Sequence, residues 1–153
     1  MNKNQIGKQE IIHFVGIGGI GMSGLAQIMK TMGFNVQGSD LNENKNTDNC
    51  KKLGIKILKG HSKKNILYAT IVVKSSAIKK NNIELLYSKK KKIPSYDRIE
   101  MLANIIDLKK NIIVTGSHGK TTTTSLVAKI ITTAKLDPTI INGGVINSLK
   151  NNA

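Results

Sequence analysis

The feature that most constrains this chain is a glycine-rich turn that joins an apolar strand to a helix. The stretch IIHFVGI (11–17) has the composition of a buried strand, and Gly16, Gly18 and Gly21 form the pattern G-x-G-x-x-G at its end. Apolar residues then recur at helical spacing until Gly33, which predicts a helix directly after the turn. Such a strand, turn and helix are typical of the first unit of a Rossmann-like sheet.

Strands and helices alternate beyond this unit. Asp97 and Glu100 have the spacing of a capping box, so a helix is expected to begin beside them. Alternation of this kind predicts an α/β fold with a mainly parallel sheet that is covered by helices on both faces. Further strands are expected at 35–40, 55–60, 69–76 and 93–96, and further helices at 47–54, 81–92 and 98–108.

A second glycine loop, G-S-H-G-K-T (116–121), follows the polar stretch 107–111. The standard phosphate-binding pattern GxxxxGK[ST] requires a glycine where this chain has Val114, so the loop is two residues shorter between its glycines. An apolar strand is expected at 112–116, and a long amphipathic helix is expected after the loop. The apolar stripe of that helix consists of Leu126, Val127, Ile130, Ile131 and Ala134, and another strand is expected at 138–142.

The residues of the second loop favour a nucleoside triphosphate as the ligand. The shorter glycine spacing narrows the cradle of backbone N–H groups without removing it. The Lys120 ammonium can bridge β- and γ-phosphate oxygens, and the Thr121 hydroxyl is placed to ligate Mg²⁺. The threonines at 122–124 are more typical of a first helical turn, and His118 is more typical of a loop-shaping residue than of a general base.

The first loop also favours a phosphate ligand, because small glycines let backbone N–H groups and a helix N-terminus approach a pyrophosphate. Asp40, at the end of the second expected strand, could accept hydrogen bonds from ribose hydroxyls. This pattern does not separate a dinucleotide from a UDP-sugar, since both carry a pyrophosphate and a ribose. An NAD(P)-dependent dehydrogenase or an NAD-sensing domain therefore stays open, as does a turn that serves only helix packing.

The net charge of +15 invites a nucleic-acid or membrane-surface role, but the composition argues against both. Arg98 is the only arginine, aromatic residues make up 3% of the chain, and tryptophan is absent. Base recognition and stacking on single strands depend on those residue types. The lysine run 89–92 closes an expected helix, where it favours the helix dipole. We therefore expect no nucleic-acid partner.

The expected location is the cytoplasm. The single cysteine, Cys50, permits no internal disulfide, which favours a reducing compartment. The apolar stretch 11–22 resembles a signal peptide, but Glu10 and His13 do not suit one, and His13 is expected to be buried and hydrogen-bonded. His61 suits a ligand contact and a solvated loop equally well. No apolar run is long enough to span a bilayer, so no membrane insertion is expected.

The chain divides into a complete Rossmann-like domain, 1–107, and the opening β-α-β unit of a second domain, 108–153. The second stretch is too short to enclose a nucleotide together with its metal ligands. We therefore expect the chain to be the N-terminal portion of a longer protein, and to be inactive by itself. The oligomeric state is left open.

With both loops considered, the chain resembles the Mur ligase family, whose ATP loop has the short G-x-x-G-K-[ST] form. This family trait accounts for the missing glycine at position 114. The resemblance spans nearly the whole chain. It is carried by HFVGIGGIGMSGLA (13–26), GSD (38–40), SSAI (75–78), RIEMLANII (98–106), GSHGKTTTTSLVAKI (116–130) and LDPTIINGGVINS (136–148).

The resemblance implies an enzyme that joins UDP-N-acetylmuramate and L-alanine through an amide bond, with ATP as co-substrate and Mg²⁺ as cofactor. A UDP-sugar-binding domain would precede a P-loop ATPase-like domain. The implied UDP-sugar residues are Gly16, Gly18, Gly19 and Gly21 at the diphosphate, and Ser39, Asp40, His61 and Ser75 near the uridine. The implied ATP residues are Gly116, Ser117, His118, Gly119, Lys120 and Thr121, of which Lys120 and Thr121 would be catalytic and Thr121 also a magnesium ligand.

Three residues depart from the pattern associated with this family. Ile83 follows Asn82 where a proline is expected. Asp97 stands where a second basic residue is expected beside Arg98, and Lys74 interrupts a normally apolar strand. All three lie at the edges of expected elements, so they bear on the stability of the fold more than on function.

Overall fold

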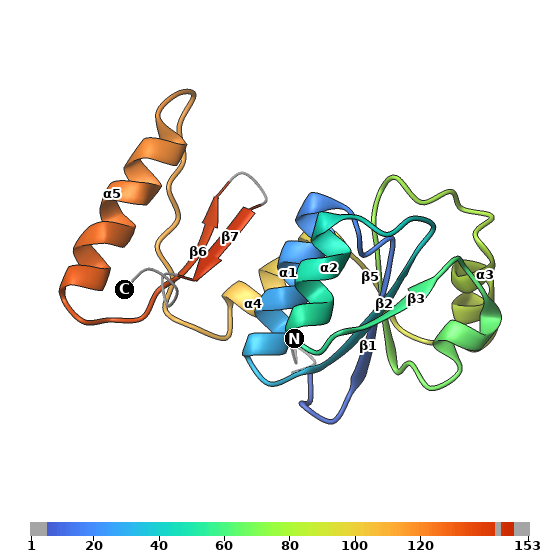
Figure 1. The fold of residues 1–153 in the computed structure, drawn as a ribbon. Helices are drawn as coiled ribbons and strands as arrows, with labels where there is room; N and C mark the ends of the chain where they lie inside the picture. Colours follow the sequence, from blue (N-terminus) through green and yellow to red (C-terminus); the bar gives the residue numbers. More distant parts are fainter. Residues whose placement is uncertain (1–5, 143–144, 149–153) are drawn as a thin grey trace.

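The computed structural model describes residues 6–142 and 145–148. The first part of the chain is a five-stranded sheet with helices on both faces (Figure 1). Its strands are β1 (Ile11–Val15), β2 (Asn35–Asp40), β3 (Lys56–Lys59), β4 (Ile71–Lys74) and β5 (Ser95–Asp97). Its helices are α1 (Ile20–Thr31), α2 (Lys45–Lys52), the 3-10 turn η1 (Lys63–Ile66), α3 (Ile83–Lys90) and α4 (Arg98–Ile106).

All neighbouring strands of this sheet are parallel, in the order β3-β2-β1-β4-β5. The chain lays down β1, β2 and β3 in one direction, then crosses back to place β4 and β5 on the other side of β1. Strand order therefore reverses between β1 and β4, and ligands of open parallel sheets bind at the carboxyl ends of the strands beside such a point. The predicted α/β fold with a mainly parallel sheet is confirmed.

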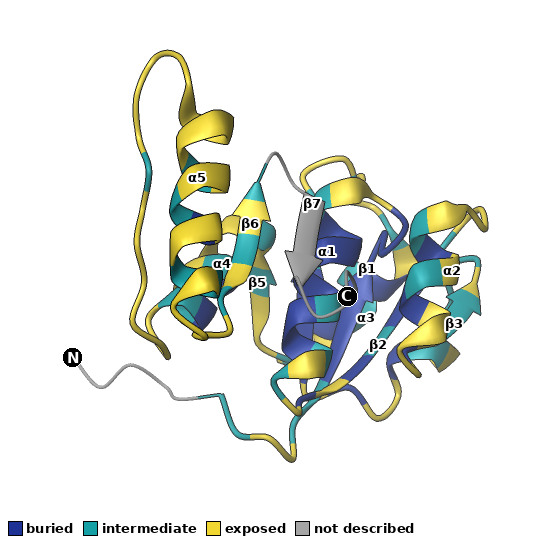
Figure 2. Cartoon of the chain, turned by 60° about the vertical axis from the view of Figure 1, so that its left-hand side comes forward, coloured by how far each residue is buried: buried dark blue, intermediate teal, exposed yellow. Residues whose placement is uncertain are grey.

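The apolar core lies on the face of the sheet that α1, α2 and α4 cover (Figures 1 and 2). Ile12 and Phe14 of β1 point into this core, as alternation along a strand requires. Burial raises the pKa of the Cys50 thiol in α2 to about 11, so this side chain is a neutral core residue. The helices also contribute Met22, Leu25, Ala26, Ile28, Met29, Met101 and Ile105.

Gly38 in β2 lets the turn after β1 lie close against the sheet. A Cβ atom at this position would be 2.6 Å from Cδ1 and 2.7 Å from Cβ of Ile17, and 2.8 Å from the backbone oxygen of Phe14. Neither the backbone oxygen nor a Cβ can rotate away, so a larger residue would force the main chain to shift. The glycine at 38 is therefore a packing requirement of the turn.

The opposite face of the sheet, under α3 and η1, carries a buried polar layer next to the apolar side chains of Val15 and Val72. His13 of β1 and Ser39 of β2 are fully buried here. Gln37 of β2 donates from Nε2 to the backbone oxygen of Asn65 in η1 at 2.8 Å and lies 3.2 Å from His13 Nδ1. The prediction that His13 is a buried, hydrogen-bonded histidine is confirmed.

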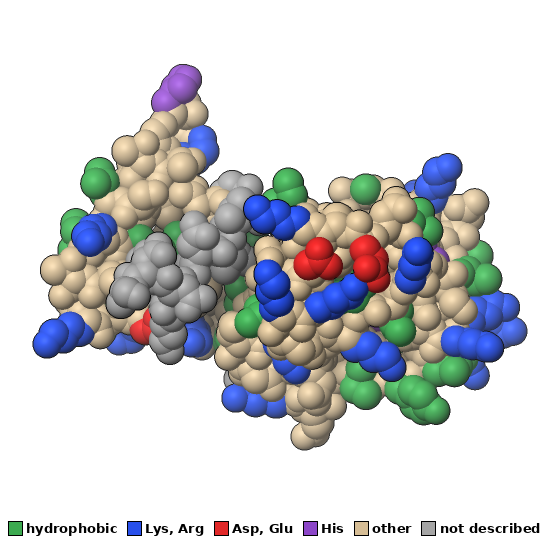
Figure 3. All heavy atoms as spheres, viewed as in Figure 1, with side chains coloured by type: hydrophobic (Ala, Val, Ile, Leu, Met, Phe, Trp, Pro, Cys, Tyr) green, Lys and Arg blue, Asp and Glu red, His purple; other side chains and the backbone are tan. Residues whose placement is uncertain are grey.

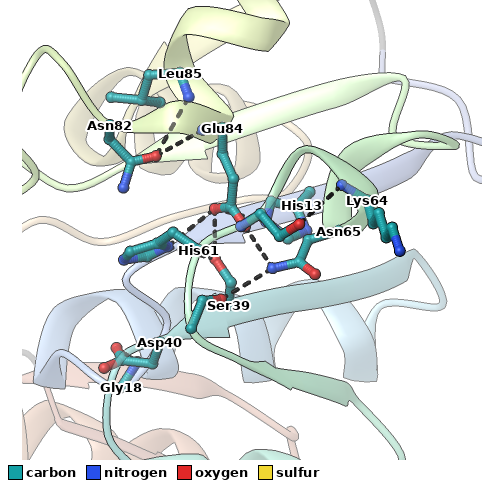
Figure 4. Close-up of polar contacts among 12 residues, drawn as sticks. His13, Gly18, Ser39, Asp40, His61, Lys64, Asn65, Asn82, Glu84 and Leu85 are labelled. Carbon is teal, nitrogen blue, oxygen red and sulfur yellow. Dashed lines mark hydrogen bonds and ion pairs between the residues drawn. The ribbon is translucent and has the colours of Figure 1, made fainter.

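Glu84, in the first turn of α3, is the centre of this polar layer and has no exposed surface (Figure 4). Its Oε2 atom accepts a hydrogen bond from Ser39 Oγ at 2.6 Å. The same oxygen lies 3.1 Å from His61 Nδ1 and 3.4 Å from His13 Nε2. Three side chains from two strands and one loop therefore meet at a single carboxylate oxygen.

The second carboxylate oxygen of Glu84 is also bonded. Oε1 accepts from Asn65 Nδ2 at 2.6 Å and from the backbone N–H of Ser62 at 3.2 Å. Burial would raise the pKa of Glu84, but the hydrogen bonds from His13 and Ser39 outweigh it and lower the pKa from 4.5 to about 2. Glu84 is therefore an ionised buried carboxylate, and its bonds tie α3 to the sheet and to the loop before η1.

Beyond Ile106 the chain forms α5 (Lys120–Thr133) and an antiparallel pair, β6 (Thr139–Asn142) with β7 (Val145–Ser148). The predicted helix after the second loop and the predicted strand at 138–142 are confirmed. These elements form a group beside the main sheet, at the left of Figure 1.

The predicted strand at 112–116 is wrong, because this segment has no regular secondary structure. A parallel strand needs a neighbouring strand for its hydrogen bonds, and no strand of the described ranges pairs with this one. Part of the predicted apolar stripe of α5 is open to solvent, whereas Val127 and Ile131 are partly buried. The side chains of Leu126 and Ile130 are 62% and 69% exposed, respectively.

Basic side chains are scattered over the face drawn in Figure 3 and do not form one continuous patch there. Lysines carry nearly all of the positive charge, and most of the described lysines are exposed. A scattered distribution gives no support to a nucleic-acid-binding surface on this face. Within the described ranges, none of the helices combines the length and apolar character that crossing a membrane requires.

The Gly38→Ala substitution is expected to lower the free energy of unfolding by about 1–3 kcal/mol, because the new methyl group overlaps Ile17 and the Phe14 backbone. The matched control is Gly7→Ala, since the nearest atoms to a Cβ at Gly7 are 3.8 Å away. Urea unfolding followed by circular dichroism measures both variants. Equal midpoints for the two variants would contradict the close approach.

The stability of the domain is expected to depend on Glu84 in acid. The folded protein takes up this proton near pH 2 and the unfolded chain near pH 4.5, so falling pH favours the unfolded state between those values. In this window the stability difference between the parent chain and Glu84→Gln should shrink by at most about 1.4 kcal/mol per pH unit. Urea titrations of both proteins from neutral pH downward measure this difference in the free energy of unfolding. A difference that does not change with pH would contradict the low pKa.

Candidate functional site

The first glycine loop lies at the carboxyl end of β1, where the strand order reverses. Gly16 has a φ of 80°, which L side chains rarely adopt, and a Cβ there would lie 2.9 Å from Cδ1 of Ile78. Ile78 belongs to the loop after β4, so the loops that follow β1 and β4 contact each other at this edge. Ser75 lies in the same β4 loop, partly exposed, and its hydroxyl accepts from the backbone N–H of Ala77.

The beginning of the loop is held by the end of β2. The backbone N–H groups of Gly16 and Ile17 donate to the backbone oxygen of Ser39 at 2.8 and 3.0 Å. The backbone N–H of Gly18 donates to Oδ2 of Asp40 at 2.7 Å. These bonds fix the path of the loop, and they leave its later N–H groups for other partners.

The start of α1 is open. Gly19 is the N-cap residue and has no side chain to cap the helix. Among the described residues, no acceptor faces the backbone N–H groups of Ile20, Gly21 and Met22. Three free N–H groups at the positive end of a helix make a suitable site for an anion.

Two asparagines that the sequence analysis did not select support this loop. The Nδ2 atoms of Asn44 and Asn46 donate to the backbone oxygen of Gly18 at 3.2 and 2.8 Å. A Cβ on Gly18 would lie 2.9 Å from Asn44 Nδ2 and 2.8 Å from Asp40 Oδ2, so a larger residue would displace the two side chains that hold the loop. Asn44 also caps α2, and this capping position is the only sequence signal that marks it.

Arg98, the first residue of α4, lies against the start of α1. A Cβ on Gly21 would be 2.9 Å from Nη1 and 3.1 Å from Cζ of Arg98, so the guanidinium covers the backbone of Gly21. The Arg98 side chain has no hydrogen bond or ion pair within the described part of the chain. A planar guanidinium beside free N–H groups suits a phosphate. In the sequence, Arg98 stands out only as the single arginine of a lysine-rich chain.

The residues expected near a uridine have different environments in the structure. Ser39 has no exposed surface, and its hydroxyl donates to Glu84. Asp40 is partly exposed and uses Oδ2 to hold Gly18. The His61 side chain is 12% exposed, and its Nδ1 atom lies 3.1 Å from both Ser39 Oγ and Glu84 Oε2. Figure 4 shows His61 and Asp40 at the same edge of the sheet as the glycine loop.

The second loop enters α5 through Gly119, which has a φ of 74°. Lys120 turns back over this loop, and its Nζ donates to the backbone oxygens of Gly116 at 2.5 Å and Ser117 at 3.2 Å. In the described ranges, the backbone N–H groups of residues 120–122 lack an acceptor. The loop therefore combines an ammonium group with an open helix start, which is again suited to an anion.

Thr121 and His118 are both exposed at this loop. The backbone oxygen of Thr121 accepts from Asn142 Nδ2 at 3.3 Å, and its hydroxyl has no partner among the described side chains. No group of three His, Cys, Asp or Glu residues that could hold a metal occurs in the parts of the chain that the structure describes. The Thr121 hydroxyl is thus the one predicted metal ligand that these residues place at the loop.

The departures noted in the sequence have local explanations. Lys74 and Asp97 occupy paired positions in β4 and β5, and Lys74 Nζ lies 3.6 Å from Asp97 Oδ1. The pair is half-exposed, so it contributes little to stability, but each residue gives the other an opposite charge. Asn82 caps α3 without a proline after it, because its Oδ1 accepts from the backbone N–H of Glu84 at 2.9 Å.

The sequence was compared with known protein families and relatives. Residues 11–110 match the profile described as Mur ligase family, catalytic domain. The chain is 68% identical over 151 residues to the UDP-N-acetylmuramate–L-alanine ligase of Pelagibacter ubique (strain HTCC1062), covering 99% of this chain and 32% of that protein. It is 54% identical over 144 residues to the ligase of the same name from Rickettsia bellii (strain OSU 85-389), covering 94% of this chain and 30% of that protein. The chain thus spans about a third of the length of these relatives.

Solved structures give the same result. The UDP-N-acetylmuramate-alanine ligase of Thermotoga maritima superposes with a TM-score of 0.77 at 36% identity, over 87% of this chain and 31% of that one. A murein peptide ligase from Psychrobacter arcticus superposes with a TM-score of 0.79 at 29% identity, over 89% of this chain and 29% of that one. Because the family profile matches more than half of the residues and the fold agrees with these ligases, the chain belongs to the Mur ligase family.

Proposed function

We propose that this chain is the N-terminal portion of a UDP-N-acetylmuramate–L-alanine ligase and that its first domain holds the UDP part of the sugar nucleotide. The observation that carries this proposal is the open start of α1, flanked by Arg98, at the point where strand order reverses. The 68% identity to a ligase of that name supports the choice of substrate.

The diphosphate would lie against the first glycine loop. Gly16, Gly18, Gly19 and Gly21 would let it approach the free N–H groups of α1, and the Arg98 guanidinium would bind it from the α4 side. Asp40 uses Oδ2 to hold Gly18, and its Oδ1 accepts from the backbone N–H of Asn42 at 3.2 Å. A carboxylate oxygen can accept more than one hydrogen bond, so the ribose hydroxyls would share these oxygens. Ser75 and His61 would lie beside the nucleoside. Ser39 would support the site indirectly, because its backbone oxygen holds the glycine loop.

The second loop would bind ATP through Gly116, Ser117, His118, Gly119, Lys120 and Thr121. The γ-phosphoryl group would pass to the muramoyl carboxylate, giving an acyl phosphate and ADP. The amine of L-alanine would then attack the acyl carbon, phosphate would leave, and an amide would remain after loss of a proton. Lys120 would stabilise the negative charge that develops on the phosphoryl oxygens.

Magnesium fits this loop through one ligand. The Thr121 hydroxyl is exposed on the first turn of α5, and it is an oxygen ligand of the kind that Mg²⁺ prefers. A bound magnesium ion would neutralise part of the triphosphate charge.

We place the domain boundary at 107/108, so that 1–107 is the UDP-sugar-binding domain and 108–153 belongs to the ATP-binding domain. The exposed side of α5 and the irregular segment at 112–116 support this division, since both lack the partners that the rest of an α/β domain would supply. The activity needs the remaining two-thirds of the ligase, so we expect the isolated chain to be inactive. We assign it to the cytoplasm, where ATP and UDP-sugars are present.

An NAD(P)-dependent dehydrogenase is not favoured. It would account for the first glycine loop and Asp40, but it would give no role to the loop at 116–121. The named relatives at high identity are ligases.

The 153-residue chain is expected to bind UDP-N-acetylmuramate in calorimetry, and Arg98→Ala should weaken binding about tenfold, because a charge-assisted phosphate contact is lost. Lys52→Ala removes the same charge from the exposed last turn of α2, so it is the matched control. A parent chain that does not bind at millimolar ligand would contradict the proposed function. Equal affinity of Arg98→Ala and the control would remove Arg98 from the site.

In the full-length ligase, Lys120→Ala should lower the rate of phosphate release about 100-fold or more, since an electrostatic contact to the transferred group is lost. Lys129→Ala, on the same helix and away from the loop, provides the control for charge and helix stability. The measurement is a coupled phosphate assay with L-alanine and UDP-N-acetylmuramate. An undiminished rate for Lys120→Ala would mean that the second loop does not bind the reacting triphosphate.

A further inference from the structure

We infer that Glu84 is a positioning residue of the nucleotide site: it holds His61 in the Nδ1–H form, so that Nε2 is presented to the nucleoside as a hydrogen-bond acceptor. This inference rests on the proposed function, because the nucleoside is the ligand expected at this edge of the sheet. Glu84 stands in none of the sequence motifs, and its role follows from contacts between segments far apart in the chain.

The proton on His61 Nδ1 follows from its neighbours. Nδ1 lies 3.1 Å from Oε2 of Glu84 and 3.1 Å from Oγ of Ser39. The Ser39 hydroxyl gives its own proton to Glu84 at 2.6 Å, so its oxygen faces His61 with a lone pair. Two acceptors therefore face Nδ1, and this nitrogen must be the donor.

The other histidine of the network does not compete for this role. The Gln37 side-chain nitrogen donates to the Asn65 backbone oxygen at 2.8 Å, which fixes the orientation of the amide. That nitrogen lies 3.2 Å from His13 Nδ1, so His13 Nδ1 is the acceptor and His13 Nε2 carries the proton toward Glu84. His13 is thereby satisfied on both sides as a neutral ring, and it has no exposed surface.

His61 differs from His13 because one of its ring nitrogens is open. Its Nε2 has no partner among the described residues, and no buried side-chain nitrogen or oxygen in those residues is left without a partner. Nε2 must therefore lie in the exposed 12% of the side chain. In Figure 4 the ring lies between Glu84 and the edge formed by Asp40 and Gly18, which is the edge assigned to the sugar nucleotide.

A neutral ring with Nδ1 protonated offers a lone pair at Nε2. The groups of a uridine that can donate to it are the imide N–H of the uracil and the ribose hydroxyls. A carboxylate at position 84 is essential to this arrangement because it can only accept when ionised. A glutamine there could direct an N–H at Nδ1, which would move the ring proton to Nε2 and replace the acceptor with a donor.

The first test is ¹⁵N NMR of histidine-labelled, ligand-free chain, in which protonated and unprotonated ring nitrogens have well-separated shifts. His61 in the parent chain should be protonated at Nδ1 and unprotonated at Nε2 near neutral pH, and Glu84→Gln should reverse this. Ser88→Ala is the control, because Ser88 is buried in the same helix but donates to the Leu85 backbone oxygen. A parent His61 protonated at Nε2 overturns the inference without any substitution.

The second test is the affinity for UDP-N-acetylmuramate. Glu84→Gln and His61→Ala should each raise the Kd about tenfold, and the double variant should be no weaker than either, because both remove the same contact. Additive losses in the double variant, or an unchanged Kd for Glu84→Gln, would show that Glu84 is only structural. A parent chain that binds no UDP-sugar overturns the proposed function and this ligand role together, whereas the NMR result separately decides whether Glu84 orients the ring.

Two UDP analogues identify the donor. UDP methylated at uracil N3 should bind about tenfold more weakly than UDP if the imide N–H meets Nε2, and 2′-deoxy-UDP should do so if the ribose is the partner. The affected analogue should lose its disadvantage in the His61→Ala background. Unchanged disadvantages of both analogues in that background would overturn the contact.

Discussion

The site depends on Ser39, a buried residue at the end of β2 that is bonded in two directions. Its backbone oxygen accepts the N–H groups of Gly16 and Ile17, which sets the turn after β1. Its hydroxyl donates to Glu84, which ties the first turn of α3 to the other face of the sheet. One residue therefore links the glycine loop with the histidine layer. A displacement of β2 would disturb the hydrogen bonds of both.

Much of the fold could be predicted because its signals are local. The strand β2 occupies the predicted residues 35–40, and the Glu100 side chain accepts from the backbone N–H of Asp97 at 2.8 Å, as the capping spacing indicated. Hydrophobic periodicity and caps act within a few residues, so a single sequence displays them. The strand at 112–116 failed because strand formation needs a partner elsewhere in the chain, and no described strand provides one.

Only part of the proposed site has a local signal in the sequence. Glycine loops are contiguous and carry their own signal, whereas Glu84 and Arg98 reach the site from α3 and α4 through packing between distant segments. A glutamate within a lysine-rich helix reads as an ordinary surface residue, and only its contacts show that it is buried and charged. Lys74 and Asp97 illustrate the same limit, since each looked anomalous alone and they pair across β4 and β5.

The apolar core has a further consequence for how the protein is made. Among the described residues, every buried member of the main cluster lies between Ile12 and Ile105, so this core is synthesised before the second glycine loop at 116–121. A domain of this kind can close during synthesis, because chains emerge at roughly 5–20 residues per second and domains fold as units. The exposed apolar side of α5 is not part of this core. The order of translation thus separates the five-stranded sheet, whose described core is complete early, from the segment that follows Ile106.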